Sequence, residues 1–184
     1  MTTKLETLDD LIEQHTKVVV ENFSKDSDTL QVIIGYSGTK RYLLPLNFAD
    51  DREKEIVLRM VTILFAAYNV KRYTFATEAY ALKLPNNEDS EKEYEKLRKE
   101  GKRISDHPNS VEILLVGAVS YEDKKLRVFD ILKDRSGLGP SEEGQAAGRF
   151  TELLPPQDLP EHAREAARKI LDTLGMKFES EDTQ

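Results

Sequence analysis

The segment from Asp50 to Leu84 constrains the fold most, because an apolar helix pattern runs almost without a loop into a long strand pattern. Asp50 and Glu53 form a start that resembles a capping box, and both carboxylates suit the positive end of a helix dipole. The apolar residues between Ile56 and Tyr68 cover more than one stripe, which is typical of a helix buried on most sides. The sequence therefore predicts a buried helix over residues 51–68.

The strand pattern that follows occupies residues 71–84, and its side chains alternate between two faces. Between Tyr73 and Leu82, both faces are uncharged except at Glu78. A strand that is apolar on both faces is normally covered on both sides. We therefore expect an interior strand with one carboxylate, Glu78, whose surroundings need an explanation.

Two further pairs of strand patterns are each joined by a short turn. Residues 29–36 and 40–46 flank a turn in which Gly38 can adopt a positive φ, and residues 110–121 and 125–133 form the second pair. Strands joined by turns and separated from helices are typical of an antiparallel sheet. The predicted fold is α+β, with a mostly antiparallel sheet of about five strands.

Three helices are expected to pack on this sheet. They are predicted at residues 7–23, 51–68 and 159–174. A fourth helix, at 91–102, has only Tyr94 and Leu97 as apolar residues, so segment 86–108 is predicted to be a charged, mobile flap or insertion. The length suits one domain, here residues 1–178, and the acidic tail 179–184 is expected to be disordered.

The composition excludes several classes of function. The chain has no cysteine, which rules out disulfides, thiolate metal sites and thiol catalysis. Its net charge of −7 argues against general binding of nucleic acid. The N-terminus has no apolar signal core, and charged residues between Arg52 and Arg59 shorten the longest apolar run. We expect a cytoplasmic protein with no membrane contact.

Motifs for cofactors and nucleophiles are missing or incomplete. The three histidines lack the local spacing of a metal site, and residues 139–146 have the glycines of a phosphate loop without its lysine. No Gly-x-Ser-x-Gly is present. His15 lies on the apolar stripe of the first helix, where a packed and hydrogen-bonded histidine is expected. No cofactor and no metal are predicted.

One group of residues remains as a candidate catalytic site: Glu78, His107 and Glu112. If the two strands are neighbours, the glutamates lie close together, and paired carboxylates raise one pKa toward the range of acid–base catalysis. In the alternative, each glutamate faces water or pairs with a basic residue. Arg41, Arg72 and Arg127 are candidates for that basic residue.

The order of features between Tyr73 and Asp134 is also informative. A strand carries Thr77-Glu78-Ala79-Tyr80, a polar excursion ends at His107-Pro108, and Val111-Glu112-Ile113-Leu114 enters a hairpin. In this order the segment resembles a group of uncharacterised bacterial and phage-encoded proteins, although the group often has a basic residue where this chain has Ser110. The resemblance implies the sheet, carries no assigned activity, and marks the two glutamates and the histidine as the residues to test first.

Two functions follow as hypotheses. The first is a non-enzymatic protein-interaction or accessory protein, which binds a protein partner, or a second copy of itself, through its sheet edge, its flap or another surface. The second is a small-molecule hydrolase with the candidate carboxylates and His107 in a pocket under the flap. A pocket that gathers all three side chains favours the hydrolase, whereas side chains already paired with arginine favour the interaction protein.

Overall fold

The computed structural model describes residues 7–26, 28–29, 31–84, 89–144, 148–176 and 181–182. These residues form an α+β fold, as predicted, with one antiparallel sheet and four α-helices. The strands are β1 (Val32–Ser37), β2 (Lys40–Pro45), β3 (Arg72–Leu82), β4 (Ser110–Ser120), β5 (Lys124–Ile131), β6 (Leu138–Glu143) and β7 (Glu181–Asp182). The helices are α1 (Leu8–Asp26), α2 (Asp51–Ala67), α3 (Ser90–Lys99) and α4 (Glu161–Thr173), with short 3₁₀ turns η1 (Ile104–Asp106) and η2 (Gly148–Thr151).

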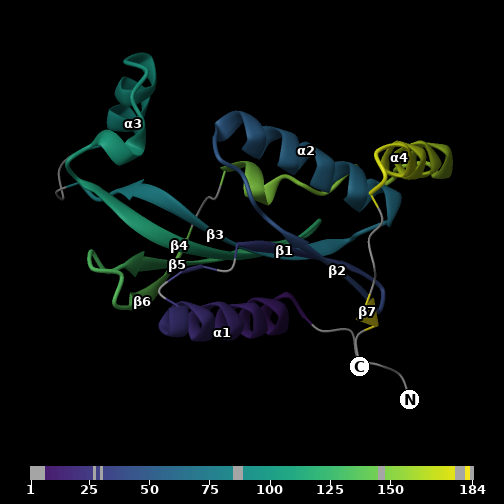
Figure 1. Ribbon diagram of the computed structural model, residues 1–184, viewed down its shortest axis with the longest axis horizontal. Coiled ribbons are helices and arrows are strands. Elements are labelled where there is room, and N and C mark those ends of the chain that lie inside the picture. The colour runs from purple at the N-terminus through teal and green to yellow at the C-terminus, as the bar shows by residue number, and fades with distance from the viewer. Residues whose placement is uncertain are drawn as a thin grey trace.

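The elements form three layers. The strands lie in the order β6-β5-β4-β3-β1-β2-β7. Helix α1 covers one face of the sheet, and α2 and α4 lie side by side on the other (Figure 1). Helix α3 stands apart from these layers, near the far ends of β3 and β4 (Figure 1).

Helix α2 begins as its sequence predicts. The Asp50 side chain accepts a hydrogen bond from the Glu53 amide at 2.8 Å, and the Glu53 carboxylate accepts one from the Ala49 amide at 2.8 Å. This reciprocal capping satisfies amides that have no partner within the helix. The helix is buried on its sheet and α4 sides, but Ile56 is 54% exposed, so the predicted burial holds for part of its surface.

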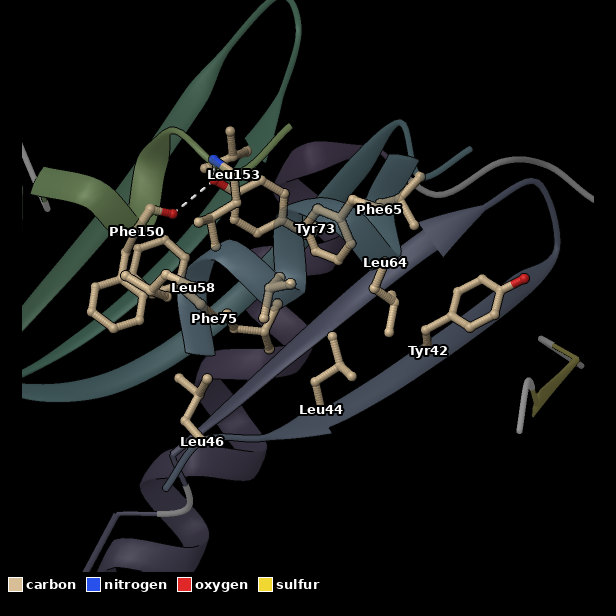
Figure 2. Packing of buried hydrophobic residues seen from close by; sticks show 14 of the residues in the cluster. Tyr42, Leu44, Leu46, Leu58, Leu64, Phe65, Tyr73, Phe75, Phe150 and Leu153 are labelled. Atoms are coloured by element: carbon tan, nitrogen blue, oxygen red, sulfur yellow. Dashed lines mark hydrogen bonds between the residues drawn. The ribbon is translucent and has the colours of Figure 1, made fainter. Parts of the chain in front are cut away.

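The larger core lies between the sheet and α2. Phe65 of α2 packs on Tyr73 of β3, and Phe75 stacks on Phe150 at a centroid distance of 5.4 Å (Figure 2). The Tyr73 hydroxyl donates to the Phe150 carbonyl at 2.7 Å, so its buried polar atom is satisfied. A second core joins α1 to the opposite face of the sheet through residues that include Val19.

Strands β3 and β4 extend beyond the strands that pair with them on either side. They pair with each other along all of Arg72–Leu82, whereas β1 pairs with β3 only over Arg72–Ala76. Strand β5 pairs with β4 only from Ile113 onward. The far ends of β3 and β4 therefore extend beyond the sheet as a two-stranded arm that leads toward α3 and η1 (Figure 1).

Three parts differ from the sequence prediction. Strand β6 was not predicted, because Gly139 and Pro140 interrupt any alternation and most of its side chains are exposed. In the predicted disordered tail, Glu181–Asp182 pair with β2, and the other tail residues lie outside the described ranges. Helix α3 docks through Leu97, which is only 5% exposed. Within the described ranges, no helix is both long and apolar enough to span a bilayer.

Candidate functional site

The register of β3 and β4 brings the two predicted glutamates together. Tyr80 lies opposite Glu112, and Glu78 lies opposite Leu114, so the glutamates are diagonal neighbours on the same face of the arm. Side chains alternate along the strand, which puts Glu78 on the α1 side together with Ala76. The two strands are neighbours, so the condition on which the sequence analysis placed the two carboxylates close together is met.

Arg135 lies between these carboxylates. Its Nη2 donates to Glu78 Oε1 at 2.8 Å, and its Nη1 donates to Glu112 Oε1 at 2.7 Å. The guanidinium also lies 5.5 Å from the ring centroid of Phe23 and 3.8 Å from Asp28. The hydrogen bonds to Glu78 and Glu112 raise the pKa of Arg135 further above its usual value. One cation thus links β3, β4 and the chain around α1.

The backbone at Arg135 adopts a left-handed conformation with φ of 55°. A residue with a β-carbon adopts this region at a cost, which the surrounding contacts must offset. Sequence reasoning did not find Arg135, because it belongs to a turn after β5, 57 residues from Glu78. A short-range pattern carries no signal for such a contact.

His107 has other partners. Its Nδ1 accepts a hydrogen bond from the Asn109 amide at 3.0 Å, and its Nε2 lies 3.7 Å from Glu93 Oε1. These contacts tie the histidine to α3 and to the start of β4. The structure thus brings the two glutamates together and holds His107 in a separate set of contacts.

This arrangement matches the alternative in which arginine pairs with each glutamate. Two ionised carboxylates repel, and a shared guanidinium offsets that repulsion through charge-assisted hydrogen bonds. The three side chains do not converge in one concave site, which was the arrangement that favoured the hydrolase. The catalytic roles of Glu78, His107 and Glu112 stay predictions.

A cavity of about 780 Å³ lies on the other face of the arm. Its floor is formed by apolar side chains of three strands and η2, namely Ala79, Ala81, Ile113, Leu115, Val128 and Phe150. The sequence of β3 explains the hollow. On the same face, Tyr73 and Phe75 fill the half of the strand that α2 covers, whereas Ala79 and Ala81 leave space beyond it.

Several of the polar groups around the cavity already have partners. Arg149 Nη2 lies 3.4 Å from Glu55 Oε2, and Lys54 Nζ lies 5.0 Å from the ring centroid of Phe150. At one end of the floor, Thr77 Oγ1 donates to Gln31 Oε1 at 3.1 Å. Among the described lining residues, no buried polar side-chain atom lacks a hydrogen-bond partner.

Neither a metal site among the described residues nor a similarity to a known protein points to a particular chemistry. Across the described part of the chain, no three His, Asp or Glu side chains are placed to hold a metal ion. No protein-family model, no curated protein and no solved structure matches this chain.

Proposed function

We propose that this protein is a non-enzymatic protein-interaction protein, and that a partner protein inserts apolar side chains into the cavity beside the arm. The single observation that carries the proposal is that cavity, with its apolar floor of about 780 Å³ volume. Apolar surface left open to water is unfavourable, so a hollow of this kind is a natural place for a partner to bury its own apolar groups.

The lining favours a protein partner over a small molecule. Small-molecule sites combine apolar walls with a few polar groups that fix the orientation of the ligand. Here Arg149 is paired with Glu55 and Thr77 with Gln31, and most of the floor is aliphatic or aromatic. Tyr94 lines the same cavity and is 48% exposed. An apolar centre with an exposed tyrosine and paired charges around it is typical of protein interfaces.

The alternative, a small-molecule hydrolase, has weaker support. Its predicted carboxylates are held by Arg135 on the opposite face of the arm from the apolar floor. His107 contacts Glu93 and Asn109 instead of the glutamates. A cytoplasmic location and a partner other than nucleic acid belong to the same proposal, and the net charge of −7 supports the second point.

Site-specific photo-crosslinking tests the proposal in cells that naturally express the protein. Tyr94 is replaced by p-benzoylphenylalanine, and the matched control carries it at Leu174, the residue after α4, which is 55% exposed and does not line this cavity. We expect a discrete protein adduct from position 94 and none from position 174.

A second variant ties any adduct to the cavity. Ala81→Trp places an indole in the hollow, and the adduct from position 94 should then disappear while circular dichroism stays unchanged. An adduct that persists with the cavity filled, or that forms equally from position 174, contradicts the proposal. A small molecule retained in the native mass spectrum, with no protein adduct, favours the hydrolase.

A further inference from the structure

We infer that the partner segment binds as an extended strand, added to the open edge of β3 at Glu78–Leu82. The inference rests on the proposed function and specifies the form of the partner. Strand addition of this kind derives its affinity from main-chain hydrogen bonds and its specificity from pockets for alternate side chains.

The outer edge of β3 is unpaired beyond the point where β1 ends. Pairing with β1 stops at Ala76, and no strand in the described ranges pairs with the following residues on that side. Thr77 donates through its hydroxyl to the side chain of Gln31, just before β1 begins. In the described ranges, no strand continues the line of β1 beside residues 78–82.

The ladder shows which amides face outward. The Lys83 amide donates to the Asn109 carbonyl at 3.0 Å, in register with the β3–β4 pairs. In an antiparallel ladder, the N–H and C=O of one residue point to the same neighbour, and the next residue points to the other side. Odd-numbered residues of β3 therefore face β4, and Glu78, Tyr80 and Leu82 turn their backbone groups toward the open edge.

The contacts on the β1 side agree with this assignment. The Leu46 amide donates to the Gln31 carbonyl at 2.9 Å, in register with the β1–β2 pairs. Odd-numbered residues of β1 therefore face β2, and even-numbered residues face β3. Val32 is paired with Ala76, so the even-numbered residues of β3 turn their backbone groups toward β1. This agrees with the β3–β4 ladder, in which the odd-numbered residues turn theirs toward β4.

The two outer edges of the sheet are less suited to a partner strand. Strand β6 carries Pro140, Glu142 and Glu143, and proline and charge at an edge oppose further pairing. On the other side, β7 pairs with Lys40 and Arg41 of β2, and the rest of β2 ends in Pro45 and borders a smaller cavity of about 310 Å³. The edge of the arm combines the outward-facing backbone groups of Tyr80 and Leu82 with the larger cavity of about 780 Å³.

The cavity fits the side chains that such a strand would present. Five consecutive β3 residues, Thr77 to Ala81, line it, so the hollow runs along the open edge. A strand added about 4.8 Å from β3 would point alternate side chains over Ala79 and Ala81, and the others toward Tyr80. The partner segment is therefore about five residues long, roughly 17 Å, extended, and apolar at alternate positions.

Amide hydrogen exchange tests the edge assignment in the free protein. In nuclear magnetic resonance spectra, the amides of Ala79 and Ala81 should exchange slowly because they bond to β4. The amides of Tyr80 and Leu82 should exchange at least tenfold faster because they face outward. Equal protection at all four positions would overturn the inference.

Three synthetic peptides test strand addition directly. The parent is acetylated and amidated Lys-Val-Thr-Val-Thr-Val-Lys, and two isomers carry N-methyl groups on one or the other alternate set of residues. A strand that pairs along one edge needs only one set of its amides. We expect the parent to slow exchange at Glu78, Tyr80 and Leu82, one isomer to bind equally well, and the other to bind at least tenfold more weakly.

The outcomes separate this inference from the proposed function. Equal binding by both isomers, or no binding of the parent at millimolar concentration, overturns strand addition. If the crosslink from position 94 still depends on the cavity, the proposed function stands without strand addition.

Tyr80→Pro adds a test on the protein side, since it removes an outward-facing amide donor that β4 does not use. It should weaken parent binding at least tenfold, whereas Tyr80→Phe, which keeps that amide, should bind as before.

Discussion

The buried imidazole of His15 should make the stability of this protein depend on pH. His15 lies in α1 and is 5% exposed, as its place on the apolar stripe predicts. The predicted hydrogen bond is not found, since neither ring nitrogen has a partner among the described residues. Burial lowers the pKa of His15 from 6.5 to about 4. Replacing it by leucine removes both the buried polar atoms and the titration.

The sign follows from which state binds the proton first. Above pH 7 the imidazole is neutral in both states, and its titration contributes nothing. As the pH falls below 6.5, the unfolded chain takes up the proton while the folded protein does not, so the free energy of unfolding decreases. The loss is about 2 kcal/mol at pH 5 and about 3 kcal/mol at pH 4.

The measurement is urea unfolding, followed by circular dichroism at pH 8 and pH 5, of the wild type and His15→Leu. At pH 8 we expect the variant to be at least as stable, because leucine leaves no buried nitrogen unsatisfied. At pH 5 the difference should grow by about 2 kcal/mol in favour of the variant, since the carboxylates titrate equally in both proteins. His162→Gln, at an exposed position of α4, is the control and should follow the wild type. A constant difference between His15→Leu and wild type would refute the reasoning.

Two further substitutions test the packing and the ion pairs. Arg135→Met should lower the free energy of unfolding by about 1–3 kcal/mol, because it leaves partly buried carboxylates unpaired, and adding Glu78→Gln should recover part of the loss. If Glu78→Gln has the same effect with and without Arg135, the two residues are not coupled. Gly117→Ala should cost about 1–3 kcal/mol in urea unfolding, because the added methyl overlaps the Phe75 ring. Gly139→Ala has its nearest neighbour at 3.5 Å and serves as its control; a similar loss in both would contradict the packing argument.

The elements with strong periodicity could be predicted from the sequence. The α2 helix has a cap, and both α2 and β3 have a consistent apolar pattern and enough length. In these two elements, local and tertiary preferences therefore agree. Strand β6 could not be predicted, because Gly139 and Pro140 disfavour strands and the pairing with β5 outweighs that preference. Propensity is a weak guide for an exposed edge.

The candidate site was only partly accessible to sequence reasoning. The proximity of Glu78 and Glu112 followed from two neighbouring strands, but their partner did not, since Arg135 lies in a turn with no regular period. The cavity also corresponds to no recognisable motif in the sequence. Its only trace in the sequence is the change from Tyr73 and Phe75 to alanines on one face of β3, which has meaning once the limit of α2 is known.

The arm also affects how the chain tolerates added sequence. The polar excursion leaves β3 and returns to β4 at adjacent positions, where the Lys83 amide bonds to the Asn109 carbonyl. Its two ends are therefore fixed by the ladder whatever lies between them, and doubling the length of a flexible loop costs only about 0.6 kcal/mol. Gly101, just after α3, has a φ of 68° and open space around its α-carbon. A fluorescent or affinity module inserted there should leave the sheet intact and report on whatever approaches the arm.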